Sequence, residues 1–388
     1  MKEGWEIKKL GEIATFQRGL TYSKNDEVEF SNSCVLRSNN IEIETMSLIL
    51  DELKYLREGF VIGEDKKIKK DSILICMSNG SKQHIGKVAF IKKDYDYAFG
   101  GFMGLITPKS NIFPKFLFYS CQSSSYKQFL AEVGNGANIT NLKFSDLSQF
   151  AIQTPSLAEQ KKIVEELDCL SGIIEKKKQQ LKEYDAIAQS IFYEMFGNPI
   201  DNEKGWEVKK LGEVCKFSQG VQVDLPLQSS EKKIGWNRFL RIVDYTTCNT
   251  DVRYVNISND KYIVNFDDVV VVRYGASAGF VGIEKEGILA NNLFKLNHDR
   301  NKLNYKYLYY LLSTDYYKDF VKDIAFGAAM PALSFNTFKN FNIFIPPLSL
   351  QQEFASKIEA IEKQKKLIKQ SIAETETLFN SRMDYYFN

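Results

Sequence analysis

The sequence predicts a mixed α/β protein with two tandem domains, each followed by a long helix. The first observation is an internal repeat, because residues 4–19 and 205–220 are identical at ten of sixteen positions. The second is that short apolar runs in each half alternate with Gly, Asn, Ser and Asp, which is typical of strands and turns. The third is that both halves then change to a helical heptad pattern. The repeat is far longer than the period of about 20–50 residues of a solenoid. We therefore interpret it as a duplicated domain.

The repeat continues to the end of each half with a constant offset of 191 residues. Tyr126, Lys127, Phe129, Pro155, Leu157 and Gln160 recur as Tyr317, Lys318, Phe320, Pro346, Leu348 and Gln351. Prolines mark the change from domain to helix in both halves. The predicted boundaries are a first domain at 1–155, a helix at 156–198, a second domain at 199–346 and a second helix at 347–388.

The individual elements follow from apolar runs and the turn residues between them. In the first domain we expect strands at Trp5–Ile7, Val35–Arg37, Ser72–Cys76, Lys87–Ile91 and Phe102–Ile106. In the second we expect them at Trp206–Val208, Phe239–Val243, Val269–Val272, Phe280–Glu284 and Asn292–Leu296. Helical turns are expected at Leu10–Ile13 and Leu211–Val214, and helices at Phe113–Ser123, Ser125–Val133, Lys306–Ser313 and Tyr316–Ile324.

Each long helix carries a narrow apolar seam in which spacings of three and four residues alternate. The seams run through Ile163, Leu167, Leu170, Ile174, Leu181 and Ile191, and through Phe354, Ile358, Ile361, Ile368 and Ile372. A lysine interrupts each seam, Lys177 in the first helix and Lys365 in the second. A long helix with one narrow apolar stripe is not stable alone. We therefore expect the two helices to pack together as an antiparallel coiled coil.

Composition limits the classes of function. The chain of 388 residues has a net charge of +2, so any nucleic-acid-binding surface must be a local patch. Six cysteines are scattered and only two histidines are present, which is neither a zinc pattern nor a disulfide framework. No run of eighteen apolar residues is present, so the sequence predicts no membrane span. We expect a cytoplasmic protein.

Catalytic motifs are absent from the sequence. It contains no phosphate-binding loop of the Gly-x-x-x-x-Gly-Lys-Ser/Thr type. Asn198-Pro199-Ile200 lacks the second proline and the aromatic residue of an amino-methyltransferase motif. Glu6-x-Lys8 and Glu207-x-Lys209 have the spacing of a nuclease motif, but their place on the opening strand of each repeat favours a structural role. We expect a protein that recognises or organises, not a catalyst.

Several repeated motifs together resemble one known family. They are the Gly-Trp-Glu-x-Lys-Lys-Leu-Gly-Glu openings, Leu36-Arg37 and Leu240-Arg241, the glycine-rich turns 78–86 and 274–282, and the Pro-x-Leu-x-x-Gln run into each long helix. The whole chain resembles the specificity (S) subunit of Type I restriction–modification systems. That resemblance implies two target-recognition domains, each reading one half of a bipartite sequence in double-stranded DNA. It further implies that the two helices set the gap between the half-sites.

The resemblance also implies partners. The helices would dock two methyltransferase (modification) subunits, which carry the S-adenosylmethionine, and a motor-nuclease (restriction) subunit is an optional further partner. The chain itself would bind no cofactor and no metal and would have no catalytic activity. We expect docking through the helix seams, at Leu167, Ile174, Leu181, Ile358, Ile368 and Ile372.

DNA contacts are expected where the two halves differ, because features common to domains that read different half-sites belong to the scaffold. Polar and cationic side chains in the loops have donors and acceptors suited to base edges. In the first half the candidates are Arg37, Asn39, Asn40, Ser81, Lys82, Gln83, Asn138 and Thr140. In the second half they are Arg241, Arg273, Tyr274 and Ser277.

Three other functions are compatible with the sequence. The chain could be the recognition subunit of a Type II-like bifunctional system, which would differ only in its partner. It could be a partner-binding scaffold from a silent cassette, without sequence-specific DNA binding. A nuclease that uses one Glu-x-Lys pair would instead show metal-dependent cleavage by the isolated chain.

Overall fold

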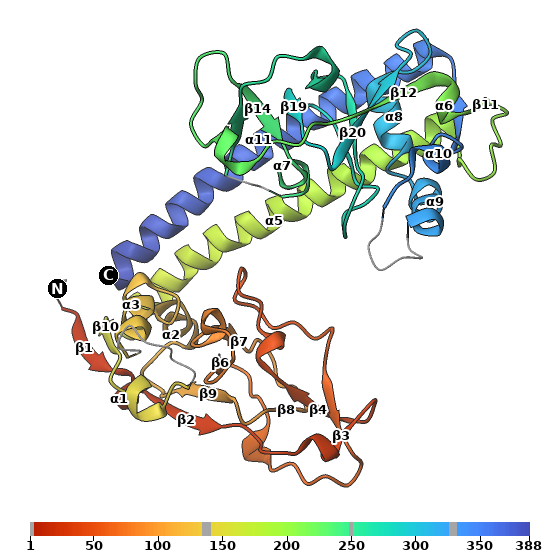
Figure 1. Ribbon diagram of the computed structural model, residues 1–388. Helices are drawn as coiled ribbons and strands as arrows, with labels where there is room; N and C mark the ends of the chain where they lie inside the picture. Colours follow the sequence, from red (N-terminus) through yellow and green to blue (C-terminus); the bar gives the residue numbers. More distant parts are fainter. Residues whose placement is uncertain (1–3, 134–140, 248–250, 326–331) are drawn as a thin grey trace. The chain divides into compact units, whose positions relative to one another are not determined.

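The computed structural model describes residues 4–133, 141–247, 251–325 and 332–388. The chain forms two compact units. Unit 1 consists of residues 1–178 and 370–388, and unit 2 consists of residues 179–369. Each unit therefore combines one copy of the repeated domain with parts of both long helices (Figure 1).

The described residues in the globular part of unit 1 form three small sheets. A two-stranded antiparallel sheet pairs the ends of the domain, β1 (Glu6–Lys9) with β10 (Ala151–Thr154). An antiparallel sheet has the order β2 (Ala14–Arg18), β9 (Met103–Pro108), β6 (Ile73–Cys76) and β7 (Val88–Phe90). The third sheet has the order β3 (Glu27–Val28), β5 (Lys54–Leu56), β4 (Ser33–Leu36) and β8 (Tyr97–Phe99), with β4 and β8 parallel.

The helices of this domain cover the β2–β9–β6–β7 sheet on one side. They are α1 (Leu10–Ile13), α2 (Pro114–Ser120), α3 (Ser124–Val133) and α4 (Phe144–Leu147). All four residues of β6 are buried. Ile73 and Ile75 belong to one core cluster, with Phe116 of α2, whereas Leu74 and Cys76 belong to a second cluster beneath β4 and β8. The strand is apolar on both faces because it separates two cores.

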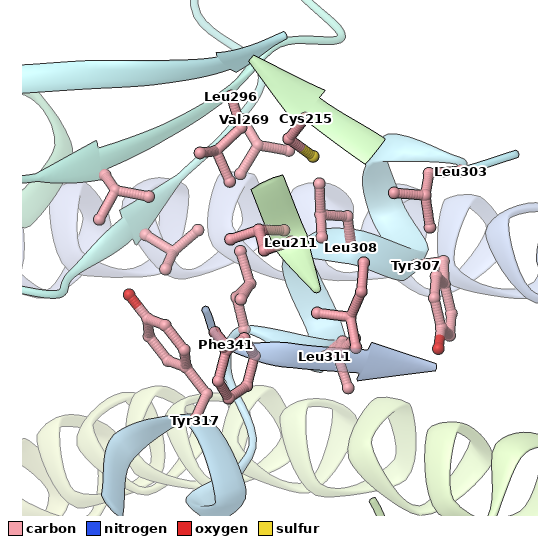
Figure 2. Close-up of a cluster of buried hydrophobic side chains, with 14 of the residues drawn as sticks. Leu211, Cys215, Val269, Leu296, Leu303, Tyr307, Leu308, Leu311, Tyr317 and Phe341 are labelled. Carbon is pink, nitrogen blue, oxygen red and sulfur yellow. The ribbon is translucent and has the colours of Figure 1, made fainter. Parts of the chain in front are cut away.

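Unit 2 repeats this topology. One sheet pairs β11 (Glu207–Lys210) with β21 (Asn342–Ile345). A second sheet has the order β12 (Cys215–Gln219), β20 (Leu293–His298), β17 (Val269–Val272) and β18 (Val281–Gly282). The third has the order β13 (Gln228–Ser229), β15 (Arg253–Val255), β14 (Asn237–Leu240), β19 (Gly287–Leu289) and β16 (Ile263–Val264). Its short helices are α6 (Leu211–Val214), α7 (Ile242–Thr246), α8 (Tyr305–Leu311), α9 (Asp315–Ala325) and α10 (Phe335–Phe338). Figure 2 shows the main core, in which Leu211, Val269 and Leu308 come from α6, β17 and α8.

Short 3₁₀ helices lie in the loops of both domains. They are η1 (Lys24–Asp26), η2 (Ser38–Asn40), η3 (Glu64–Lys66), η4 (Lys82–His84), η5 (Leu225–Leu227) and η6 (Asp260–Tyr262). Two of them, η2 and η4, contain predicted DNA-contacting residues.

The two long helices, α5 (Leu157–Phe196) and α11 (Leu348–Phe387), have 40 residues each. In unit 1 the first part of α5 lies beside the last part of α11, because Lys177 donates to Ser371 over 2.5 Å and Lys178 pairs with Glu376 over 2.8 Å. In unit 2 the last part of α5 lies beside the first part of α11, because Asp185 of α5 pairs with Lys365 of α11 over 2.7 Å. The predicted antiparallel pairing is confirmed, and both seam lysines bond across it.

One predicted strand was wrong in part. The run Phe239–Val243 was expected to be extended, but β14 ends at Leu240 and α7 begins at Ile242. The carboxylate of Asp244 accepts a hydrogen bond from the backbone N–H of Arg241 over 2.9 Å, which starts a helical turn. The β-branched residues in this run favour a strand, but their pattern does not reveal the bond that caps the helix.

Candidate functional site

In unit 1 two loops with predicted DNA-contacting residues meet. The amide of Asn79 donates to the hydroxyl of Ser38 over 2.7 Å, which joins the loop before η4 to η2. Asn39 lies on one side of this contact and is exposed, and Ser81 and Gln83 lie on the other and are also exposed. Lys82 is the first residue of η4. The predicted residues Asn138 and Thr140 lie outside the described residues.

Asn40 has a structural role, contrary to its predicted one. Its side chain is buried, with 1% of the residue exposed. Its Oδ1 accepts from the N–H of Arg37 over 2.8 Å, and its Nδ2 donates to the carbonyls of Ile49 and Glu52 over 3.0 and 3.1 Å. Because these bonds all lie inside the domain, Asn40 cannot also read a base edge. Arg37 is half-buried, and its Nε is enclosed without a hydrogen-bond partner.

In unit 2 the equivalent positions form a cluster of arginines and aspartates. Arg241 and Asp244 correspond to Arg37 and Asn40 at an offset of 204 residues (241 − 37 and 244 − 40). The buried carboxylate of Asp244 accepts from Arg241 Nε over 3.2 Å through Oδ2 and from Arg238 over 3.3 Å through Oδ1. Asp251 then pairs with Arg241 over 3.2 Å and with Arg253 over 2.9 Å. Sequence reasoning selected Arg241 alone.

Arg238 and Arg253 were missed because nothing in their local sequence marks them. They lie on β14 and β15, whose antiparallel pairing sets Arg238 opposite Tyr254 and Phe239 opposite Arg253. Arg238 stands next to the start of the predicted strand Phe239–Val243, and Arg253 lies in no predicted strand. Their common neighbourhood depends on strand pairing, which a single sequence does not reveal.

The other predicted residues of unit 2 lie in the turn between β17 and β18. The guanidinium of Arg273 donates to Gln219 Oε1 over 2.7 Å and to the carbonyl of Leu333 over 3.3 Å. It also lies 4.4 Å from the ring centre of Phe335. Tyr274 and Ser277 follow it and are half-buried. Arg273 is thus held by three elements, with N–H groups left over for a ligand.

The matching glycine-rich turns, 78–86 and 274–282, are anchored in the same way in both units. The hydroxyl of Tyr126 donates to the carbonyl of Gly86 over 3.1 Å, and that of Tyr317 donates to the carbonyl of Gly279 over 2.9 Å. Both glycines have positive φ, +79° and +90°. Tyrosine hydroxyls are protonated donors at neutral pH, and burial raises the pKa of both tyrosines further. The common frame therefore carries loops of different chemistry.

The predicted docking residues require a correction. Leu167, Ile358 and Ile372 are buried, and Leu167 and Ile358 belong to the core clusters of units 1 and 2. A side chain packed inside its own unit cannot contact another protein directly. The seam is the surface that each helix buries within this chain, so the heptad pattern identified an internal contact. Ile174, Leu181 and Ile368 are half-buried, and their role stays a prediction.

The helices instead expose apolar side chains outside the seam. Ile187 of α5 is 47% exposed and Leu378 of α11 is 50% exposed. These two residues occupy equivalent positions, since 378 − 187 equals the repeat offset of 191. Other exposed apolar side chains on the helices are Leu157, Ile173, Leu367 and Tyr385. None of these four has an exposed large apolar side chain at the equivalent position.

The described residues contain no group of three or more His, Cys, Asp and Glu side chains that could hold a metal ion. Glu6 and Lys8 pair with each other over 2.9 Å, and Glu207 and Lys209 over 3.0 Å. Each pair lies on the strand that opens its domain, which agrees with the structural interpretation of the Glu-x-Lys spacing. Within the same described ranges, no helix is long and apolar enough to cross a membrane.

Comparisons with known proteins agree with this arrangement. The family model for the Type I restriction modification DNA specificity domain matches residues 2–183 and 203–377. The specificity subunit of the Type I restriction enzyme StySPI from Salmonella potsdam is 25% identical over 393 residues, covering 93% of this chain and 82% of the relative. The EcoKI specificity subunit from Escherichia coli (strain K12) is 25% identical over 398 residues, with the same coverage of both chains.

Solved structures show the same fold. The S subunit of a Type I restriction–modification system from M. genitalium has a TM-score of 0.59 at 14% identity, covering 99% of this chain and 96% of the other. A chain from a study of complex assembly and conformational transition in the type I R-M system has a TM-score of 0.58 at 17% identity, covering 99% and 97%. The two family-model matches account for both halves of the repeat, and the chain therefore belongs to the Type I restriction–modification specificity subunits, with one DNA specificity domain in each half.

Proposed function

We propose that each domain of this specificity subunit reads one half of a bipartite site in double-stranded DNA, and that the chain has no catalytic activity of its own. The observation that carries the proposal is the duplicated DNA specificity domain with a common frame and different loops. Sequence is read by side chains at base edges, so two domains with different loops suit two different half-sites.

The reading surfaces that we propose differ between the units in the side chains that they carry. In unit 1 the exposed side chains of Asn39, Ser81 and Gln83 offer uncharged donors and acceptors around the Asn79–Ser38 contact. In unit 2 the cluster of Arg238, Arg241 and Arg253 offers guanidinium groups, which suit guanine edges. Half-sites of different composition are the expected consequence.

The partners that we propose are two methyltransferase subunits, which bind S-adenosylmethionine, and optionally a restriction subunit. Specificity subunits of restriction enzymes are the curated relatives, and one structural neighbour comes from work on assembly of the type I system. The helices would set the gap between half-sites and dock the methyltransferases. A cytoplasmic location is part of this proposal, because its ligand is DNA.

Ile187 and Leu378 are the docking positions that the structure favours over the buried seam. Two copies of one partner need two equivalent surfaces, and this pair is exposed and related by the repeat offset. We expect Ile187→Glu to remove one methyltransferase subunit and the double variant with Leu378→Glu to remove both, as measured by the mass of the complex. Gln189→Glu and Asn380→Glu, an equally spaced and exposed pair on another face of each helix, form the matched control. Full assembly of the double apolar variant would reject this surface.

The function itself is tested by mapping N6-methyladenine in the host genome with and without the gene. Loss of one split motif, with two short blocks around an unspecified gap, is the expected result. Arg241→Ala should then alter the preference in one block only. An unchanged methylome, with both the chain and a methyltransferase expressed, would instead support a scaffold without DNA specificity.

A further inference from the structure

A single buried glutamine side chain joins the globular part of each unit to its long helix. Gln160 lies in the first turn of α5 and is 1% exposed, and Gln351 lies in the first turn of α11 and is fully buried. Polar side chains without charge are seldom buried to this degree unless their hydrogen bonds are satisfied.

In unit 1 the amide of Gln160 binds three backbone positions. Its Oε1 accepts from the N–H of Phe113 over 2.8 Å. Its Nε2 donates to the carbonyl of Pro155 over 2.9 Å, with a longer contact of 3.5 Å to the carbonyl of Asn111. Phe113 immediately precedes α2, which belongs to the domain, whereas Pro155 lies in the linker to α5. The amide thus connects the domain, the linker and the helix.

Unit 2 repeats the same three bonds. Gln351 Oε1 accepts from the N–H of Asn304 over 2.8 Å, and its Nε2 donates to the carbonyls of Lys302 and Pro346 over 2.9 and 2.8 Å. All three partners lie 191 residues after those of Gln160. The two domains have different loops but the same joint.

Two further features stiffen this joint. Only Pro155 and Ser156 separate β10 from α5, and only Pro346 and Pro347 separate β21 from α11. Proline fixes φ, and a linker of two residues that contains proline therefore has few conformations.

An ion pair about two turns further along each helix adds a second tie to the domain. Lys115 of α2 pairs with Asp168 over 2.5 Å, and Lys306 of α8 pairs with Glu359 over 3.2 Å. A helix that is attached at two points along its length cannot rotate freely against the domain.

We propose that Gln160 and Gln351 are positioning residues that fix the angle between each recognition domain and its helix, and thereby the gap that the protein accepts between half-sites. This inference rests on the proposed function. One additional base pair moves a half-site by about 3.4 Å and rotates it by about 34°, since about 34–36 Å corresponds to one turn of DNA. A domain that could rotate relative to its helix would still reach the displaced half-site, whereas a domain held at a fixed angle would not.

The test uses the full chain in complex with its methyltransferase partner. Gln160→Ala, Gln351→Ala and the double variant are compared with the parent protein on DNA duplexes that carry both half-sites, with the native gap or a gap one base pair shorter or longer. We expect the preference for the native gap to fall about tenfold in the double variant, in which both joints have lost a buried hydrogen-bonding group, and by less in each single variant. Base preference within each half-site should not change.

Controls separate this effect from a loss of folding. Gln→Met at both positions keeps the volume and removes the hydrogen bonds, so it provides the test if the alanine variants do not fold. Gln352→Ala changes the exposed neighbour and should leave the gap preference unchanged. Folded, assembled variants with the parent's gap preference would overturn the role of the joint. A parent protein that prefers no split sequence at all would instead refute the proposed function.

Discussion

At the residue scale, one position distinguishes the two domains most clearly. Asn40 in the first domain donates to two backbone carbonyls, whereas its counterpart Asp244 orients two arginines. We expect Asp244→Asn to weaken binding about tenfold to the half-site read by the second domain, because charge-assisted bonds to a guanidinium contribute about 1.5–3 kcal/mol. Binding to duplexes with either half-site scrambled measures the effect.

The exposed ion pair of Asp267 with Arg300 provides the control for that substitution. Asp267→Asn removes the same charge elsewhere in the second domain and should leave the affinity for both half-sites unchanged. Equal losses at both half-sites in Asp244→Asn would contradict a role specific to the second domain.

The glycines of the matching turns give a prediction about stability. A Cβ on Gly86 would lie 2.3 Å from Leu130 Cδ1, and one on Gly279 would lie 2.4 Å from Val321 Cγ1. Because both glycines also have positive φ, each Gly→Ala variant should lose about 1–3 kcal/mol of unfolding free energy in denaturant titrations. Gly80 has open space around it, so Gly80→Ala should be nearly neutral. Equal losses at Gly80 and Gly86 would refute the steric argument.

At the element scale, we expect the pairing of α5 with α11 in unit 1 to depend on pH. Hydrogen bonds from Arg382 and then Tyr386 lower the pKa of Glu166 in the folded protein. A carboxylate with a lowered folded-state pKa stabilises the fold above its ordinary pKa of about 4.3, and this contribution is lost as the pH falls through the folded-state value. Glu166→Gln should therefore lower Tm at neutral pH, with a difference that shrinks below about pH 4. Glu165→Gln, at an exposed neighbour, should lower Tm little at either pH.

The sequence could predict the elements that depend on local periodicity. The two long helices, the turns at Leu10–Ile13 and Leu211–Val214, and β17 follow from apolar spacing and turn residues, and the structure confirms them. The arginine cluster could not be predicted, because it depends on the pairing of β14 with β15. Leu167, Ile358 and Ile372 were misplaced as docking residues for a different reason. A heptad seam shows that a face is buried but does not say by which chain.

At the scale of the whole molecule, exchange of the first domain should change half of the recognised sequence. We expect a chain in which residues 1–155 come from a relative to methylate a site with one new block and one unchanged block, as read by genome-wide methylation mapping. The structure adds a condition, because Phe116 of α2 contacts Phe387 of α11 and Tyr119 contacts Phe379. Donor domains should keep aromatic residues at these positions. A change in both blocks would show that the domains do not read independently.

Unit 1 is built from two separate stretches of chain, and this affects its folding while the protein is synthesised on the ribosome. Unit 2 is one continuous stretch, and all of its residues leave the ribosome before residues 370–388 do. Unit 1 needs residues 370–388 and is incomplete until they emerge. Met383 and Phe387 are buried in the core cluster that also contains Phe116 and Leu167. Until they emerge, the domain made first keeps an apolar surface uncovered, a state that favours aggregation. We therefore expect the first half of the chain to be the last to finish folding.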